Sequence, residues 1–307
     1  MSKSRRRLGV IGTGVWARSL HIPAAAASPH VELTSVFGRR SWAVAAIAEE
    51  HGAHAFTELS AFFDSIDLVV IAVPPQAQPA LARAAAEFGI PALLEKPVSL
   101  DPRDAYAVAT AFETRGLPAA VFFAQLLMPR VEDWVAELRA RGGWRFARLD
   151  RFSRVLVDAG DPFHATAWRA AAGALWDTGP HAVAMATAVL GPVTSVSAVS
   201  GPGDLTVLTL QHAEAVSTIA LAMDAACALP NETAFFGDAG RQVMPPAVDW
   251  NSEARVAFDR AIASLVQAVE DPSTAVPYPA RFGADVTAVL HAAAASMQNG
   301  RREHLDR

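Results

Sequence analysis

Residues 8–11 form a short apolar run that leads directly into the pattern Gly12-x-Gly14-x-x-Ala17. This pattern is typical of a strand that turns sharply into a helix around a dinucleotide. The first glycine permits the tight turn, the second lets the backbone approach a pyrophosphate, and the alanine keeps the helix close to the sheet. We expect Gly12, Thr13, Gly14, Val15 and Trp16 to bind the cofactor. The N–H groups from about Thr13 to Trp16 would face the phosphates along the helix dipole.

The residues that follow alternate between apolar strands and helical segments as far as residue 123. Strands are expected at residues 31–37, 53–56, 67–73, 90–94 and 119–123, and helices at 41–50, 78–88 and 101–115. The alternation predicts an α/β fold with a doubly wound parallel sheet of the Rossmann type over residues 1–121. A plain β-turn before a core helix would also explain the glycine pattern, but this continuation favours dinucleotide binding.

The second half of the chain has a different pattern. Strands are expected at residues 194–200, 205–211, 215–223 and 233–237, and helices at 258–269 and 284–297. These strands are separated by polar or glycine-containing turns, which is typical of consecutive antiparallel strands. The pattern predicts an α+β domain over residues 122–307 with an open, mostly antiparallel sheet.

Composition excludes several classes of protein. With 307 residues, 52% of them hydrophobic, the chain can bury a large core, and its net charge of −5 argues against a general nucleic-acid binder. The single cysteine, Cys227, excludes an internal disulfide framework, suits a reducing cytoplasm and is expected to be a small buried hydrophobe. The arginines at 5–7 resemble a twin-arginine export signal, but the apolar run after them is the expected phosphate-binding strand. No run of about 18 uncharged apolar residues follows that could span a bilayer. A cytoplasmic protein is therefore predicted.

The end of the second expected strand bears on the choice of cofactor. Enzymes that use NAD usually place a carboxylate there to hold the adenosine ribose, whereas this chain has Phe37-Gly38-Arg39-Arg40. A guanidinium can pair with a ribose 2′-phosphate through two hydrogen bonds, and a carboxylate would repel it. Arg39 and Arg40 therefore favour NADP(H) over NAD(H), although two solvated arginines at a sheet edge would give the same sequence.

Glu95-Lys96-Pro97 follows the expected strand at residues 90–94 directly. Ligands of open α/β sheets bind beyond the carboxyl ends of the strands. A lysine there can lose part of its solvation and act as an acid or base near neutral pH. Glu95 could anchor the ammonium, a ribose or an amide group. A surface turn would explain the same three residues.

Three features occur together in the order and spacing of one family: the glycine loop, the strand end at Pro74-Pro75, and Glu95-Lys96-Pro97. With His21-Ile22-Pro23 in the first helix, they make the chain similar to the Gfo/Idh/MocA oxidoreductases, which include glucose–fructose oxidoreductase and inositol dehydrogenase. The resemblance implies a dinucleotide-binding domain followed by a substrate domain with an open sheet. One face of that sheet would cover the substrate pocket or a second subunit.

The resemblance further implies that an aspartate and a histidine join Lys96 around the substrate carbon that exchanges hydride with nicotinamide. The family pattern Asp-x-Gly-x-His matches residues 177–181. The residues themselves predict a helix that starts near Pro180, with Asp177 or Thr178 as its cap and His181 in its first turn. The helix dipole disfavours imidazolium there and leaves a neutral base for an alcohol proton. Asp177 would orient the imidazole or bind a substrate hydroxyl, although a capping aspartate beside a hydrogen-bonded histidine would also explain the pair.

Further cofactor contacts are implied by the resemblance alone. They are Val73, Pro74, Gln78, Glu95, Lys96, Trp168 and Arg169. Trp168 could equally be a core aromatic. The chain also departs from the family pattern: Gln78 stands where many relatives carry histidine, the turn before Asp177 is Ala-Ala-Gly-Ala rather than three glycines, and Gln125 lacks the arginine that usually follows it. A pocket more apolar than that of a typical sugar dehydrogenase is therefore expected.

These observations together predict an NADP(H)-preferring oxidoreductase in which Lys96 and His181 share proton transfer and Asp177 orients. By resemblance, the substrate is a sugar, cyclitol or related small molecule, and the subunits form a homodimer or homotetramer through the second sheet. Two alternatives stay open: a reductase of less polar carbonyl or imine compounds, and a catalytically silent dinucleotide-binding regulator. No nucleic acid, membrane or metal ion is expected as a partner.

Overall fold

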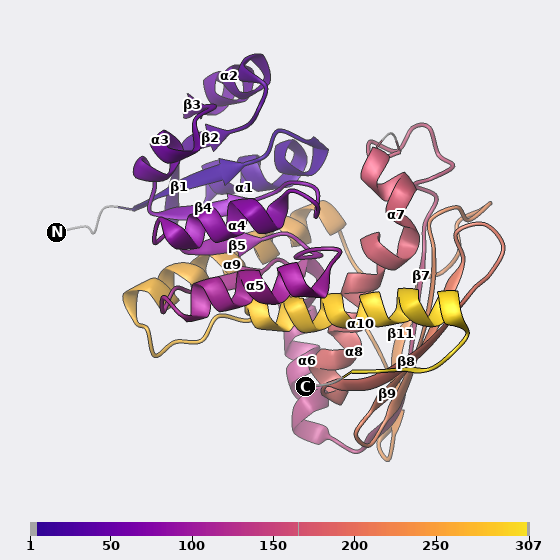
Figure 1. The fold of residues 1–307 in the computed structure, drawn as a ribbon. Helices are drawn as coiled ribbons and strands as arrows, with labels where there is room; N and C mark the ends of the chain where they lie inside the picture. Colours follow the sequence, from indigo (N-terminus) through magenta and orange to yellow (C-terminus); the bar gives the residue numbers. More distant parts are fainter. Residues whose placement is uncertain (1–4, 165, 306–307) are drawn as a thin grey trace. The chain divides into compact units, whose positions relative to one another are not determined.

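The computed structural model describes residues 5–164 and 166–305. The chain divides into two compact units (Figure 1). Unit 1 holds residues 5–99, 103–128 and 247–284, and unit 2 holds residues 100–102, 129–246 and 285–305 apart from residue 165. The division into two domains at residues 121 and 122 stays a prediction.

Unit 1 is built on a six-stranded sheet in the order β3-β2-β1-β4-β5-β6, with every neighbouring pair parallel. The strands are β1 (Arg6–Ile11), β2 (Val31–Phe37), β3 (His54–Phe56), β4 (Leu68–Ile71), β5 (Ala92–Leu94) and β6 (Ala119–Val121). All residues of β4, β5 and β6 are buried, as expected of strands covered on both faces. Strand order reverses between β1 and β4, which is where open α/β sheets bind ligands. The predicted doubly wound parallel sheet is confirmed.

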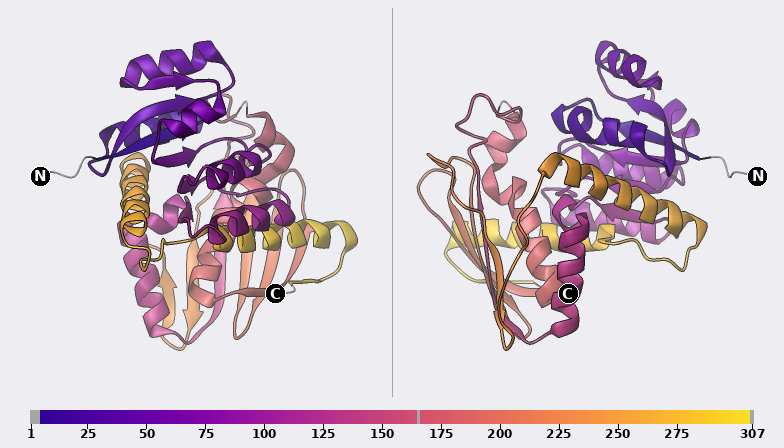
Figure 2. Two further views of the ribbon diagram at one scale, coloured as in Figure 1. Left: turned by 60° about the vertical axis from the view of Figure 1, so that its left-hand side comes forward. Right: turned by 180° about the vertical axis from the view of Figure 1, so that it is seen from behind.

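The helices of unit 1 come from both halves of the sequence. They are the π-helix η1 (Ala17–His21), α1 (Ile22–Ala27), α2 (Ser41–His51), α3 (Leu59–Asp64), α4 (Gln78–Glu87), α5 (Pro102–Glu113), the 3₁₀-helix η2 (Ala124–Leu127) and α9 (Trp250–Glu270). Helix α9, drawn in orange in Figure 2, packs against α1, β5, β6 and η2. This late helix was predicted as part of the second domain, yet its apolar face completes the core around the first sheet.

Unit 2 contains a seven-stranded sheet in the order β12-β11-β7-β10-β9-β8-β13. Its strands are β7 (Trp144–Phe152), β8 (Val193–Ser200), β9 (Thr206–His212), β10 (Val216–Ala222), β11 (Thr233–Gly237), β12 (Gly240–Val243) and β13 (Glu303–His304). Only the β7–β10 pair is parallel, so the predicted mostly antiparallel sheet is confirmed. The helices are α6 (Pro129–Arg141), α7 (Ala167–Asp177), α8 (Gly179–Leu190) and most of α10 (Ala280–Asn299).

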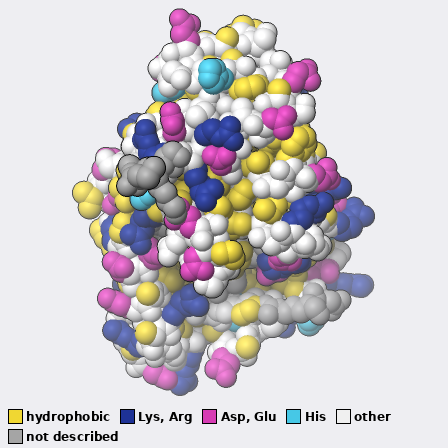
Figure 3. Space-filling view, turned by 90° about the vertical axis from the view of Figure 1, so that its left-hand side faces the viewer, with side chains coloured by type: hydrophobic (Ala, Val, Ile, Leu, Met, Phe, Trp, Pro, Cys, Tyr) yellow, Lys and Arg dark blue, Asp and Glu magenta, His cyan; other side chains and the backbone are white. Residues whose placement is uncertain are grey.

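The exposure of the single cysteine, the distribution of charge and the character of the helices bear on three expectations from the sequence. Cys227 is exposed in the segment between β10 and β11, so the expectation of a buried cysteine is wrong, because residues 226–231 lie outside the sheet and are all exposed. On the face shown in Figure 3, acidic and basic side chains are interspersed. Among the described residues, no helix combines the length and the apolar character needed to cross a membrane.

Candidate active site

The glycine loop after β1 is shaped so that only glycine fits at its first position. Gly12 has a φ of 137°, and a Cβ there would lie 2.2 Å from the carbonyl oxygen of Ala72. The Ala72 N–H in turn donates to the carbonyl of Ile11 over 2.8 Å, which fixes the loop against the end of β4. A Cβ on Gly14 would meet no atom within 4 Å, so this backbone is open to an approaching group. The loop thus has the accessible backbone that a pyrophosphate-binding site requires.

The helix after the loop begins as predicted. Helical backbone starts at Val15, which is exposed, and continues through the half-buried Trp16 into η1. The Arg18 N–H donates to the carbonyl of Gly14 over 3.1 Å, the first bond of the helical turn that follows the glycine loop. The strand, turn and helix predicted from the sequence are therefore present in that order.

The loop after β2 lies against the glycine loop. The Gly12 N–H donates to the carbonyl of Phe37 over 3.0 Å, and a Cβ on Gly38 would come within 2.8 Å of the Thr13 Cγ2 atom. Arg39 and Arg40 follow immediately and are both exposed. Within the described part of the chain, neither guanidinium is paired with a carboxylate.

A buried carboxylate links the helix after the glycine loop to the loop after β5. Glu95 is 7% exposed, and its Oε1 atom accepts a hydrogen bond from the Trp16 indole over 2.7 Å. The same oxygen lies 2.7 Å from Nε2 of His21, which is itself completely buried. The Lys96 N–H donates to the other oxygen of Glu95 over 3.1 Å. The Glu95 carboxylate is therefore hydrogen-bonded by these protein groups. From the sequence we expected it to bind an ammonium, a ribose or an amide group.

Gln78, the first residue of α4, is completely buried and its amide faces the same loop. Its Oε1 atom accepts from the Glu95 N–H over 2.8 Å. Its Nε2 atom donates to the carbonyls of Glu95, Pro97 and Val98 over 2.7, 3.2 and 3.2 Å. The cofactor contact predicted for Gln78 stays a prediction that these bonds do not support, because the amide is occupied by the protein's own backbone.

The remaining predicted residues of unit 1 lie at the same edge of the sheet. Val73 is half-buried and Pro74 exposed in the turn between β4 and α4, where the carbonyl of Pro74 accepts from the Ala77 N–H over 2.9 Å. Lys96 is half-buried directly after β5, and the peptide bond between it and Pro97 is cis. The carboxyl ends of parallel strands thus bring together the residues predicted to contact the cofactor in this unit.

In unit 2 the structure distinguishes between the two caps predicted before His181. Asp177 is the last residue of α7 rather than a cap, and Thr178 stands at the cap of α8 without a capping hydrogen bond. The Thr178 hydroxyl instead donates to the carbonyl of Ala174 over 3.0 Å. Of the two predicted caps, Thr178 therefore holds the cap position and Asp177 does not, because α7 runs almost without interruption into α8. His181 does lie in the first turn of α8, as predicted, and is half-buried.

The predicted glycine-containing turn before Asp177 is a kink inside α7. Gly173 has a φ of 69°, and a Cβ there would lie 2.5 Å from Oδ1 of Asp204. The Asp204 carboxylate accepts from the Ala174 N–H over 3.0 Å and from the Met223 N–H over 3.0 Å. Burial raises the pKa of Asp204, and these two N–H groups counteract part of that rise. Asp204 could not be predicted as a partner of this kink, because no local pattern connects it to residues 173 and 174.

Asp177 is held by an ion pair. The Arg169 Nε atom donates to Oδ2 of Asp177 over 2.9 Å, and both side chains are largely buried. The Arg169 guanidinium lies over the rings of Phe163 and Trp168, 4.6 and 4.7 Å from their centres. Trp168 is half-buried and flanks this pair. The arrangement leaves Asp177 oriented by Arg169, and the cofactor contacts of Trp168 and Arg169 stay predictions.

The catalytic residues predicted from the sequence are divided between the units, Lys96 in unit 1 and Asp177 with His181 in unit 2. Their convergence on one substrate stays a prediction. In the described part of the chain, no group of three or more His, Cys, Asp or Glu side chains is arranged to hold a metal ion.

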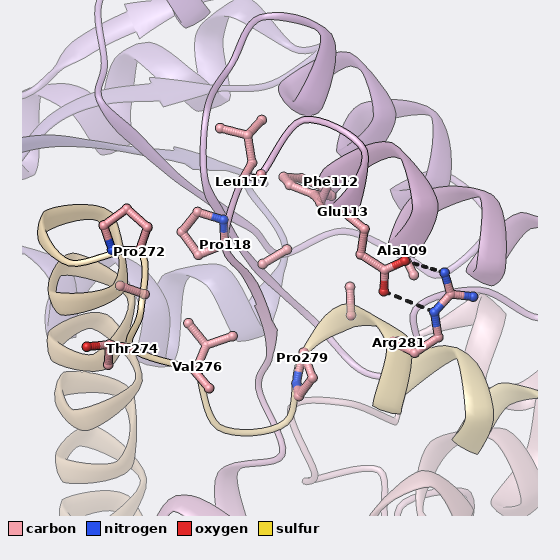
Figure 4. A pocket seen from close by; sticks show the side chains of 15 residues that line it. Ala109, Phe112, Glu113, Leu117, Pro118, Pro272, Thr274, Val276, Pro279 and Arg281 are labelled. Carbon is pink, nitrogen blue, oxygen red and sulfur yellow. Dashed lines mark hydrogen bonds and ion pairs between the residues drawn. The ribbon is translucent and has the colours of Figure 1, made fainter.

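A separate pocket of about 270 Å³ lies in unit 1, beside α5, the start of β6 and the segment between α9 and α10 (Figure 4). Its mostly apolar wall includes Phe112, Leu117, Pro118, Val276 and Pro279. Glu113 and Arg281 form an ion pair on one side. None of the predicted site residues lines this pocket, which is at the amino end of β6, whereas the candidate site follows the carboxyl ends of the strands.

Comparison with known proteins agrees with this geometry. Residues 6–123 match the model of the GFO_IDH_MocA family, described as an oxidoreductase family with an NAD-binding Rossmann fold. The UDP-N-acetylglucosamine 3-dehydrogenase of Acidithiobacillus ferrooxidans is 31% identical over 126 residues, 41% of this chain and 39% of that protein. D-xylose 1-dehydrogenase (NADP(+)) 2 of Haloferax volcanii is 30% identical over 187 residues, 60% of this chain and 57% of that protein. The chain therefore spans only about half the length of these curated relatives.

Solved structures show that the whole fold is shared. The WlbA dehydrogenase of Bordetella pertussis, in complex with NADH and UDP-GlcNAcA, is 20% identical with a TM-score of 0.84, covering 99% of this chain and 100% of that one. Apo scyllo-inositol dehydrogenase of Lactobacillus casei is 14% identical with a TM-score of 0.85, covering 99% of each chain. At these identities the likeness concerns the fold alone.

Proposed function

Since this chain belongs to the Gfo/Idh/MocA oxidoreductase family through residues 6–123, we propose that it is an oxidoreductase that moves hydride between a nicotinamide dinucleotide and a small hydroxyl- or carbonyl-bearing molecule. The observation that supports this proposal most directly is the glycine loop. The Ala72 carbonyl leaves no room for a side chain at position 12, and the backbone at Gly14 is open to an approaching group. Together with the helix start at Val15, this loop fits a dinucleotide pyrophosphate.

Arg39 and Arg40 support a preference for NADP(H). Both are exposed beside the glycine loop, and the segment from Phe37 to Trp42 contains no acidic residue that would repel a 2′-phosphate. The loop would hold the pyrophosphate, and Arg39 would pair with the ribose phosphate. The name of the Haloferax volcanii relative, which includes NADP(+), is compatible with this choice.

Lys96 is proposed to exchange a proton with the substrate oxygen. The chain contains 26 Lys and Arg residues, of which only Lys3 and Lys96 are lysines. Nearly all basic positions of the chain therefore carry arginine rather than lysine. Arginine cannot give up a proton in proteins, whereas lysine can, so the lysine beyond β5 has a chemical use that charge alone does not explain. The Glu95 carboxylate accepts from the Lys96 N–H, and the Gln78 amide bonds to the backbone of Glu95 and Pro97 on either side of this lysine.

His181 is proposed to share proton transfer with Lys96, and Asp177 to orient the substrate or the imidazole. A bound nicotinamide dinucleotide would supply the hydride acceptor for oxidation of a carbinol carbon, or the hydride donor for reduction of a carbonyl carbon. The hydroxyl proton released as the carbonyl forms passes to the imidazole or to the neutral amine. In the reverse direction the same groups return it.

We assign the substrate to the sugars, cyclitols and related polyols. The names of the two curated relatives, which act on a nucleotide sugar and on xylose, support this class. A small-molecule substrate also agrees with the absence of a basic excess, since the net charge is −5. We further propose assembly into a homodimer or homotetramer through the sheet of unit 2.

The test begins with calorimetric titration of the purified chain with NADPH and NADH in parallel. We expect NADPH to bind about tenfold more tightly or better, and Arg39→Ala to remove that difference. Arg83→Ala, an exposed arginine on α4, is the matched control and should change nothing. Tighter binding of NADH would overturn the NADP(H) preference and leave the oxidoreductase standing. Binding of neither dinucleotide would overturn the enzyme itself.

Turnover is then measured with sugars, cyclitols and less polar carbonyl compounds. Lys96→Arg keeps the charge but replaces a group that can release a proton with one that cannot, so it should lower kcat by roughly 10²- to 10⁴-fold without abolishing dinucleotide binding. Activity confined to the less polar compounds would replace the proposed substrate class. Dinucleotide binding with no turnover of any compound would favour a silent regulator.

A further inference from the structure

Trp42 is an exposed aromatic side chain in the first turn of α2. It is 70% exposed, the most of any aromatic residue among the exposed large hydrophobic side chains of the described chain. A single exposed hydrophobic residue is common on protein surfaces and needs no explanation by itself. The surroundings of this indole, rather than its exposure, make it informative.

The Arg40 guanidinium lies over the Trp42 ring, 5.3 Å from its centre. A guanidinium at this distance is attracted by the negative face of the ring, and the contact restrains both side chains. The pair forms a flat, cationic and aromatic surface within one short loop. A flat π-system with an attached anionic group is the ligand that such a surface suits.

The position of the pair defines which part of a ligand would reach it. The loop from Gly38 to Trp42 follows the carboxyl end of β2, and Gly38 packs against Thr13 of the glycine loop. A dinucleotide that places its pyrophosphate at the glycine loop directs its adenosine half toward the end of the second strand. The pair therefore lies in the loop after the second strand, toward which the adenosine half of such a dinucleotide would extend.

We propose that Trp42, with Arg40 against its ring, is a stacking surface for the adenine base of the cofactor, and that Arg39 serves the ribose phosphate. The proposal rests on the proposed dinucleotide binding and adds a base-recognition residue to it. Trp42 and Arg39 would therefore recognise different parts of the cofactor. Stacking on an indole depends on the purine and is indifferent to the 2′-phosphate, whereas pairing with a guanidinium depends on that phosphate.

Calorimetric titrations of NADPH and NADH into wild type, Trp42→Ala, Trp42→Phe and Arg39→Ala test the proposal. We expect Trp42→Ala to weaken both dinucleotides about tenfold, Trp42→Phe to retain most of the affinity, and Arg39→Ala to weaken NADPH alone. Trp250→Ala is the matched control, because Trp250 is also exposed in unit 1, at 40%, but begins α9. Urea unfolding of each variant verifies that the exposed substitutions leave the fold intact.

The outcomes separate the two proposals. If wild type binds NADPH and Trp42→Ala binds it within twofold of wild type, the stacking surface is overturned and the oxidoreductase stands. If Trp42→Ala weakens NADPH but leaves NADH unchanged, Trp42 does not recognise the base, and the stacking surface is again overturned. If wild type binds neither dinucleotide, the proposed function fails and the stacking surface fails with it.

Discussion

A single buried amide organises the loop on which Lys96 lies. Gln78 accepts one hydrogen bond from the backbone of this loop and donates to three of its carbonyls, and its side chain has no contact with solvent. Backbone groups that are buried with no partner cost about 1–3 kcal/mol each. The conformation of residues 95–98 therefore depends on an amide at position 78, and we assign Gln78 as a positioning residue for Lys96.

Replacing this amide should destabilise the protein and disturb Lys96. We expect Gln78→Ala to lower the free energy of unfolding by roughly 2–4 kcal/mol, because the loop N–H and carbonyls lose their partner. Gln76→Ala removes an exposed glutamine from the same turn and should cost less than about 0.5 kcal/mol in urea titrations.

A second readout separates positioning from stability. Reductive ¹³C-methylation labels only Lys3, Lys96 and the amino terminus, so the Lys96 resonance can be followed by NMR across pH. Its chemical shift should change in Gln78→Ala and not in Gln76→Ala. An unchanged Lys96 resonance in folded Gln78→Ala would leave Gln78 with a structural role only.

The residues of the site differ in how well the sequence predicts them. Gly12 and Gly14 are predictable because their roles depend on local backbone geometry, which the motif specifies. Gln78 was assigned to the cofactor by its position in a family pattern, but the direction of a side chain depends on packing that no local pattern records. Trp42 and Asp204 gave no signal, since the first has an ordinary position in a helix and the second acts 30 residues from the amide that it binds.

Helix α8 is anchored at its far end by a histidine from the neighbouring sheet. His181 lies in its first turn, and Gly191 forms its carboxyl cap. His212 is 1% exposed at the end of β9, with Nδ1 2.7 Å from the Gly191 carbonyl and Nε2 3.0 Å from the Ser217 hydroxyl. A neutral imidazole with its proton on Nδ1 satisfies both contacts. Burial lowers the pKa of His212, and the carbonyls of Gly191 and Pro192 oppose that shift only in part.

This histidine makes stability depend on pH in a defined direction. Because the folded pKa lies below the unfolded value of about 6.5, the unfolded chain binds a proton that the folded chain does not as the pH falls through that window. The free energy of unfolding should therefore fall below pH 6.5, by at most about 1.4 kcal/mol per pH unit for this one group. Urea titrations at pH 7.5, 6.5 and 5.5 measure the loss.

His212→Gln retains a hydrogen-bonding side chain without the titration, so its unfolding free energy should depend less on pH than that of wild type. His54→Gln, at an exposed position on β3, is the matched control and should keep the wild-type profile. Equal pH dependence in wild type and His212→Gln would show that His212 does not titrate differently in the folded chain.

Elements with a regular hydrophobic pattern were predicted nearly to the residue. Val31–Phe37 and Thr233–Gly237 are strands as expected, and the helix expected at 41–50 is observed as Ser41–His51. Strand β7 was missed because Arg145, Arg148 and Arg151 interrupt its apolar residues, although it lies in the middle of the second sheet. The helical course of α7 was missed because its kink at Gly173 depends on the distant Asp204 carboxylate.

At the scale of the whole molecule, sequence order and spatial grouping differ. The prediction of two domains in series assigned α9 to the second half, yet α9 contributes to unit 1, where Phe258 packs against His21. An amphipathic pattern shows that one face of a helix is buried, but it does not show which sheet buries it. The proposed reaction adds a requirement of the same kind, because it needs Lys96 of unit 1 and His181 of unit 2 to act on one substrate.

A double-variant cycle tests whether the two units act on one chemical step. If Lys96 and His181 share proton transfer, Lys96→Ala and His181→Ala should each lower kcat by roughly 10²- to 10⁴-fold, and the double variant should be little worse than the poorer single variant. Groups that contribute independently to the barrier of one step would instead give losses that multiply. Steady-state turnover of all four proteins with one active substrate supplies the comparison, and urea unfolding verifies that each is folded. If the losses in kcat multiply in the double variant, a shared role of Lys96 and His181 in proton transfer is contradicted, even if both residues prove essential for turnover.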